Sequence, residues 1–159
     1  MNWVIRSTKI VKFHTNLAET LKPIWEWLTE YDWILTDLDF ISDDIVPIHF
    51  DQDIFVLNRE QFEVLFNSRT QIIWGIILAV PKNINPDLNL LLRLSSEDID
   101  VWKSNQFLFE KSYLEIVAFD SGYTIIKFKE EKLSHKFKEY FQEEAIDLEQ
   151  FNKKYLRQN

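Results

Sequence analysis

The sequence has no cysteine, and its 159 residues include only two glycines and four prolines. Without cysteine the chain has no disulfide, no zinc–thiolate site and no thiol nucleophile. With so few glycines it also lacks the GxGxxG and GxxxxGKS loops that hold nucleotide phosphates. These absences exclude several chemistries and leave composition and charge as the main guides to function.

Long uninterrupted hydrophobic runs are also missing. Residues 1–16 mix charged and apolar residues, unlike a signal peptide. The longest apolar-rich run, which begins at Ile72, is about half the length of a membrane span. We therefore expect a cytoplasmic protein with no membrane partner. A composition of 46% hydrophobic and 28% charged residues, without repeat or linker, predicts a single domain over residues 1–159.

Basic residues are absent from one segment, residues 23–58, which holds nine acidic residues. The rest of the chain has the other 17 acidic residues and all 18 lysines and arginines. The net charge of −8 therefore resides in this segment. Because such a face repels phosphate, we do not expect nucleic acid as a partner.

Alternating apolar patterns predict strands over residues 3–13, 31–40 and 71–80, the last as a central strand covered on both faces. A change of phase predicts a bulge or turn near Thr36 and Asp37. Two alternating runs within residues 113–129 predict a hairpin, with Gly122 taking the positive φ of its loop. Residues 46–58 are expected to form one or two short strands, and residues 88–94 are either a strand or the flank of a loop.

Helices are predicted where a capping residue precedes apolar residues at helical spacing. Asn16, Asn58 and Asp147 are the expected N-caps, and Pro23 should end the first helix near Leu21. A short helix is also expected near residues 99–102. The predicted fold is α+β, with a largely antiparallel sheet of about five to seven strands and a single layer of N-terminal and C-terminal helices packed against it.

The acidic segment contains two patterns similar to those of catalytic or metal sites. Asp37 and Asp39 form an Asp-x-Asp pattern similar to the nucleophile motif of haloacid-dehalogenase-type phosphatases, but the glycine-containing turn and βα repeats of such enzymes are missing. His49, Asp51 and Asp53 alternate, so on a strand they would share a face and could hold a divalent metal ion. The other interpretation is a solvated strand face, and no cofactor is predicted.

The same segment is also suited to meet a protein partner. Exposed tryptophans are common anchors of interfaces, and we expect Trp33 and Trp74 in the core. The predicted acidic binding face consists of Asp37, Asp39, Asp43, Asp44, Asp51 and Asp53 with Trp25 and Trp27 as anchors.

Three short stretches carry a resemblance to known proteins: LKPI at 21–24, YDWIL at 31–35 and EIVAFDSGY at 115–123. The chain resembles small uncharacterised bacterial α+β proteins. Its acidic, aromatic-rich character and its late hairpin followed by a helix are similar to immunity proteins, which neutralise toxins of bacterial contact-dependent competition. The resemblance implies a protein partner and assigns no role to any residue.

Three functions remain open on this basis. The leading hypothesis is a non-enzymatic protein-binding domain, such as an immunity-type inhibitor, that presents an acidic face to a basic partner. The alternatives are a divalent-metal-dependent hydrolase that uses the aspartates of residues 37–53, and a structural or housekeeping domain without a ligand. The protein is expected to be a monomer or a homodimer.

Overall fold

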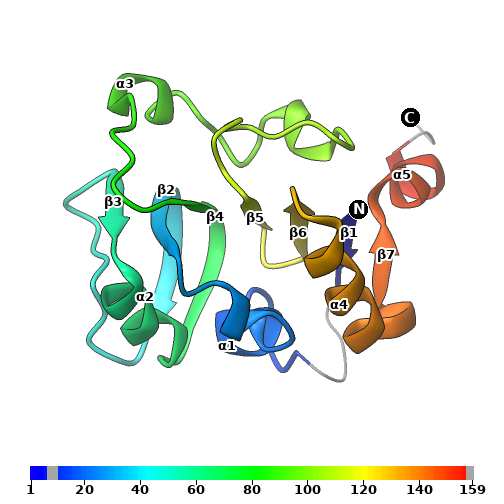
Figure 1. The fold of residues 1–159 in the computed structure, drawn as a ribbon, viewed down its shortest axis with the longest axis horizontal. Helices are drawn as coiled ribbons and strands as arrows, with labels where there is room; N and C mark the ends of the chain where they lie inside the picture. Colours follow the sequence, from blue (N-terminus) through cyan, green and yellow to red (C-terminus); the bar gives the residue numbers. More distant parts are fainter. Residues whose placement is uncertain (7–10, 157–159) are drawn as a thin grey trace.

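The computed structural model describes residues 1–6 and 11–156, and its centre is one antiparallel sheet of seven strands. The spatial order of the strands is β3-β2-β4-β5-β6-β1-β7 (Figure 1). Their bounds are β1 Asn2–Ile5, β2 Tyr31–Ser42, β3 Ile54–Leu57, β4 Thr70–Pro81, β5 Leu114–Phe119, β6 Tyr123–Phe128 and β7 Ala145–Asp147. The predicted α+β class and antiparallel sheet are confirmed, and β4 is an internal strand, between β2 and β5.

Three helices cover one face of the sheet: α1 Leu17–Leu21, α2 Arg59–Phe66 and α4 Glu131–Phe141. Figure 1 shows them in a row across the strands, and their apolar side chains share one core with Trp33 and Leu35 of β2. The Asn16 and Asn58 side chains accept the backbone N–H groups of Glu19 and Gln61, so both predicted N-caps are confirmed.

The opposite face is covered mainly by short elements, which the expected single helix layer did not include. They are α3 Leu88–Leu91, the 3-10 helix η2 Ile99–Trp102 and α5 Leu148–Phe151. The buried apolar residues of these three elements belong to one core that also contains Ile34 of β2 and Val117 of β5. The remaining helical turns are η1 Trp25–Trp27, η3 Gln142–Glu144 and the π-helical η4 Asn152–Leu156. Asp147 caps α5 as predicted. No helix among the described residues is long and apolar enough to cross a bilayer.

Several expected elements differ from the structure. The first strand ends at Ile5, and residues 7–10 of its predicted range lie outside the described residues. Residues 46–53 form turns and loop, and only residues 54–57 are a strand. Residues 88–91 form α3, because the Asp87 side chain accepts the Asn89 and Leu90 N–H groups and starts a helix there. In the β5–β6 loop, Asp120 and Ser121 take the positive φ values, 48° and 50°, that were expected of Gly122.

A buried ion pair joins the two strands of this hairpin on the second face. Glu115 and Lys127 are directly opposite each other, their side chains are fully buried, and Nζ lies 3.5 Å from the Glu115 Oε1. Lys127 also donates to the carbonyls of Asp100 and Gln106, while Glu115 accepts the Leu108 N–H. The pair therefore fastens residues 100–108 to the sheet.

Burial acts against both charges of this pair. It raises the pKa of Glu115 above its ordinary value, and the positive charge of Lys127 opposes that rise. It lowers the pKa of Lys127, and the charge of Glu115 opposes that fall. Each group thus depends on the other to stay ionised inside the protein.

We expect Lys127→Met to lower the free energy of unfolding by about 3 to 5 kcal/mol, because it leaves a buried carboxylate without its cation. The double variant Glu115→Leu/Lys127→Met should lose less free energy of unfolding than Lys127→Met alone. Urea denaturation of wild type, both single variants and the double variant gives the coupling energy. Additive losses would contradict a mutually dependent pair.

The variants Lys127→Met and Glu115→Gln should also differ in the pH dependence of their stability. In Lys127→Met the pKa of Glu115 is raised above its unfolded value, so stability is greatest below that unfolded value, near 4.5, and falls as the pH rises. In Glu115→Gln the pKa of Lys127 is lowered, so stability is greatest above its unfolded value, near 10.5, and falls as the pH decreases. Thermal melts across the pH range measure both slopes, and equal slopes in the two variants would contradict the assignment.

Candidate functional site

The acidic segment contains the predicted irregularity of β2. The pairing of β2 with β4 shifts register between Thr36 and Asp39 and again between Asp39 and Phe40, and Asp37 has a φ of 54°. An aspartate adopts this left-handed conformation more readily than most residues, since its short side chain can bond nearby backbone. The bulge predicted near Thr36 and Asp37 is confirmed.

A glycine on the neighbouring strand makes room for the bulge. A Cβ at Gly75 of β4 would lie 2.6 Å from the Cδ2 atom of Leu38. The Leu38 side chain therefore occupies space that a side chain at residue 75 would otherwise need, while the Leu38 Cα would be 3.7 Å from such a Cβ. An isolated glycine within a strand pattern was the available sequence signal for this contact.

The Asp37 carboxylate ties the bulge to the segment that follows α3. Its Oδ2 accepts the Ser96 backbone N–H at 2.7 Å and the Ser96 hydroxyl at 2.6 Å. Hydrogen bonds to a charged acceptor are stronger than neutral ones. Asp37 thus acts within the fold as the anchor of residues 92–97, rather than as a free acid of the binding face.

Three hollows adjoin along the bulge, and we call them together the bulge groove. The central hollow has a volume of about 280 Å³ and is lined by Thr36, Asp37, Leu38, His49, Phe50, Gln52, Asp53, Leu92 and Leu94. The apolar hollow, of about 520 Å³, is lined by Phe40, Ile41, Ser42, Asp44, Ile45, Val46, Ile48, His49 and Phe50. The indole hollow, of about 250 Å³, is lined by Asp37, Leu38, Asp39, Trp74, Ser96 and Glu97.

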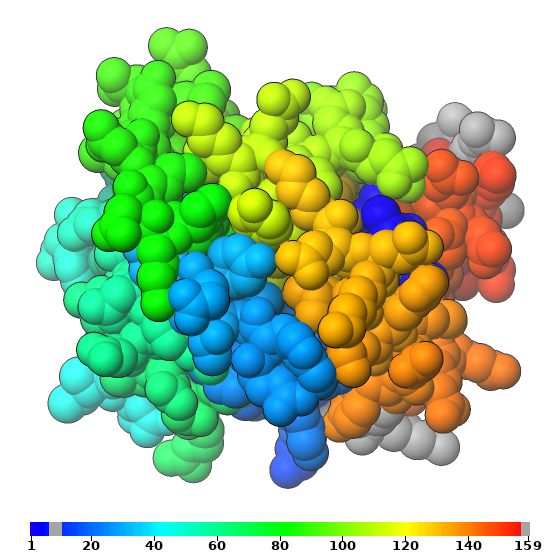
Figure 2. Space-filling view, viewed as in Figure 1, coloured from blue at the N-terminus to red at the C-terminus, as the bar shows by residue number. Residues whose placement is uncertain are grey.

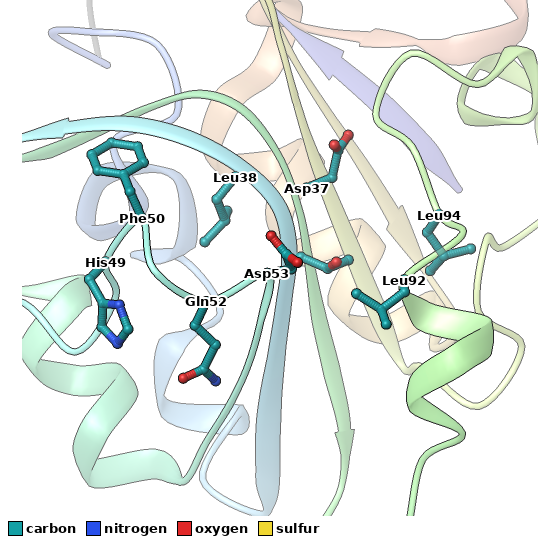
Figure 3. Close-up of a pocket in the computed structure, with 9 residues that line it drawn as sticks. Asp37, Leu38, His49, Phe50, Gln52, Asp53, Leu92 and Leu94 are labelled. Atoms are coloured by element: carbon teal, nitrogen blue, oxygen red, sulfur yellow. The ribbon is translucent and has the colours of Figure 1, made fainter.

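Shared residues place the three hollows next to one another. His49 and Phe50 line both the central and the apolar hollow, and Asp37 and Leu38 line both the central and the indole hollow. Figure 3 shows His49 and Phe50 on one side of the central hollow, Leu92 and Leu94 on the other, and Asp53 between them. The groove therefore runs from an apolar end to an acidic, aromatic end.

Large apolar side chains are exposed at the apolar end. Ile45 is 97% exposed, Phe50 69% and Ile41 61%, although Phe50 also stacks on Phe40 with 4.6 Å between ring centroids. Single exposed apolar residues are ordinary, but a group that lines one hollow is typical of an interaction surface. Sequence reasoning missed these three residues as a group, because the loop conformation that brings them to one hollow leaves no local pattern in the sequence.

The aspartates of this region have no cation within the chain. None of the seven aspartates from Asp32 to Asp53 forms an ion pair with a described residue. Asp32, Asp37 and Asp44 accept backbone N–H groups of Asn83, Ser96 and Arg69 at 3.4, 2.7 and 2.7 Å. Within the described part of the chain, no hydrogen bond reaches the carboxylates of Asp39, Asp43, Asp51 and Asp53.

The predicted metal set is not assembled. His49, Asp51 and Asp53 lie in turns and loop before β3, so the alternation that would place them on one strand face does not apply. His49 packs edge-on against Phe55 at 5.2 Å, and Asp51 lines none of the three hollows. In residues 1–6 and 11–156 no three His, Cys, Asp or Glu side chains are grouped as a metal ion requires.

The tryptophans are also placed differently from the prediction. Trp25 stacks on Phe66 at 3.8 Å and lies beneath the Arg59 guanidinium at 3.4 Å, while Trp27, 37% exposed, lies beneath the Lys136 ammonium at 4.1 Å. Figure 2 shows their segment between α2 and α4, and neither residue lines the bulge groove.

The two tryptophans expected in the core have different environments. Trp33 is fully buried, as predicted. Trp74 is half-buried and lines the indole hollow instead.

Comparison of the chain with protein-family models, with curated proteins and with solved structures found no match.

We expect Asp37→Ala to lower the free energy of unfolding by about 2 to 3 kcal/mol, since it removes two hydrogen bonds to a carboxylate and leaves a left-handed residue without local support. The Ser96 amide should also exchange its hydrogen faster. Ser96→Ala is the matched control, because it removes the hydroxyl bond and keeps the amide bond, and it should cost less. An equal loss of unfolding free energy in both variants would show that the hydrogen bond from the Ser96 amide to Asp37 does not contribute to stability.

Proposed function

We propose that the protein is a non-enzymatic protein-binding domain that presents the bulge groove to a basic partner protein. The observation that carries this proposal is the combination of exposed apolar side chains with aspartates that no described cation neutralises. Stable interfaces commonly join a desolvated apolar centre to a polar rim. The groove supplies the apolar centre, and the aspartates supply the rim.

The charge of the groove supports a basic partner. A fixed negative field accelerates the encounter with a positively charged surface and suppresses binding of acidic proteins. The unneutralised aspartates lie on both sides of the apolar hollow in sequence, Asp39 and Asp43 before it and Asp51 and Asp53 after Phe50. A partner that buries Phe50 or Ile45 would therefore bring its own cations against several carboxylates.

The construction of the groove supports a preformed site. Its floor is the long pair β2 and β4, and one wall is held to that floor by the Asp37–Ser96 hydrogen bonds. Asp44 also accepts the Arg69 N–H and so joins the end of β2 to the start of β4. A surface that is ordered before binding loses less conformational entropy on association.

An immunity-type inhibitor is the form of this function that we favour, in line with the resemblance of the sequence to immunity proteins. Many nucleases bind phosphate through basic surfaces, so an acidic protein that covers such a surface competes directly with nucleic acid. The partner would then be a basic toxin rather than a nucleic acid.

The test uses the protein as bait in extracts of its native organism. Wild type should retain a basic partner that the variant Ile45→Ser/Phe50→Ser binds at least tenfold more weakly, because it lacks the apolar anchors. Val64→Ser on α2, 52% exposed and outside the groove, is the matched control and should bind like wild type. Binding should also weaken as salt increases.

Two results would contradict the proposal. One is a partner that binds the Ile45→Ser/Phe50→Ser variant as tightly as wild type. The other is the recovery of no partner from the native organism together with a neighbouring gene that encodes no toxin. We expect the variants to melt at the same temperature as wild type, because Ile45 and Phe50 are mostly exposed. Unchanged melting temperatures would show that the fold of the variants is intact.

A further inference from the structure

The indole hollow combines an aromatic ring with two free carboxylates. Trp74 of β4 is directly opposite Asp39 of β2 in the strand pairing, so their side chains are cross-strand neighbours. Glu97, from the segment after α3, lines the same hollow. Neither carboxylate has a hydrogen bond or ion pair with any described residue, so the hollow holds two negative charges beside an indole.

This hollow is held in place by contacts on each of its sides. The Asp37–Ser96 hydrogen bonds fix the residue next to Glu97, and the Glu97 N–H bonds to the Ser95 hydroxyl at 3.2 Å. Trp74 packs edge-to-face with Phe119 of β5 at 4.7 Å. The positions of the ring and of the Glu97 backbone are therefore set by the fold before any ligand arrives.

Other tryptophans of the chain show what such a ring accepts. Trp25, Trp27 and Trp3 each have a cation of this chain near the ring, at 3.4 Å for Arg59, 4.1 Å for Lys136 and 5.2 Å for Lys138. No described cation covers Trp74, although its neighbours are carboxylates. The indole hollow has the surroundings of a cation site and lacks a cation of its own.

We propose that the indole hollow binds the side chain of an arginine from the protein partner. A guanidinium is planar, weakly hydrated and always charged, so it can pack against an indole while its N–H groups bond to carboxylates. Lysine, a compact and strongly hydrated charge, satisfies both contacts less well. The inference rests on the proposed function, because it names the partner group that occupies one end of the same groove.

The order of the three adjacent hollows defines the chemistry of the partner segment. An arginine in the indole hollow leaves the neighbouring residues of that segment over the central hollow, where Asp53 lies, and toward the exposed Phe50. The partner segment should therefore carry an arginine and a large apolar residue. The indole hollow would contribute charge pairing with the arginine, and the apolar hollow would contribute burial of the apolar residue.

The first experiment titrates the protein with N-acetyl-arginine amide and follows the indole N–H signal of Trp74 by NMR, assigned with Trp74→Phe. We expect a saturable shift at low salt. The neutral citrulline analogue should give none, and the lysine analogue should bind more weakly. Absence of a Trp74 shift with the arginine probe overturns the inference, as does an equal affinity for citrulline or lysine.

Variants that each remove one negative charge test whether Asp39 and Glu97 are the carboxylates that bind arginine. Asp39→Asn and Glu97→Gln should each weaken arginine binding by about tenfold, as expected for a lost charge-assisted hydrogen bond. Glu26→Gln removes the same charge from the acidic segment, but Glu26 lines none of the three hollows and is not part of the binding face, so this control should bind like wild type. Equal weakening in all three variants would indicate a general field effect and overturn the site.

Measurements with the recovered partner separate this inference from the proposed function. If Asp39→Asn/Glu97→Gln binds the partner like wild type while Ile45→Ser/Phe50→Ser does not, the arginine site is wrong and the binding groove stands. If both double variants bind like wild type, the groove itself is wrong. Loss of affinity in both supports the two proposals together.

Discussion

The buried ion pair between Glu115 and Lys127 is the contact on which the second face of the sheet depends. Each charge is unstable in the interior without the other, and together they hold the backbone of residues 100–108 through three hydrogen bonds. Residues 92–97, which form one wall of the groove, come just before residues 100–108. They are held to the sheet by the hydrogen bonds from Ser96 to Asp37. The binding surface is therefore positioned by two polar attachments as well as by apolar packing.

Local chemistry in the sequence was sufficient for much of the fold. The caps Asn16, Asn58 and Asp147 each accept a backbone N–H three positions further along the chain, so they can be predicted from the neighbouring sequence. The bulge near Asp37 was also predictable, because an extra residue in a strand shifts the apolar alternation at that point. The prediction of a strand or a loop flank was wrong for residues 88–91, because the Asp87 side chain caps a helix there.

The site was predicted only as a region of charge. The aspartates of residues 37–53 were identified, but the partners that turn them into a groove come from distant positions: Ser96 bonds to Asp37, and Trp74 pairs with Asp39. Trp25 was expected at the interface because it is an aromatic residue in the acidic segment. Its ring is instead covered by Phe66 and Arg59, contacts that depend on how α2 packs. Tertiary contacts of this kind leave no local signal.

The position of β1 has a consequence for synthesis on the ribosome. Residues 31–81 contain β2, β3 and β4, which pair only with one another until β5 arrives, so this half of the sheet can form early. β1 is made first, yet its partners are β6 and β7, whose residues lie beyond position 122. Within the sheet, β1 must therefore remain unpaired until β6 has been synthesised, and closure of this half of the sheet is a long-range step.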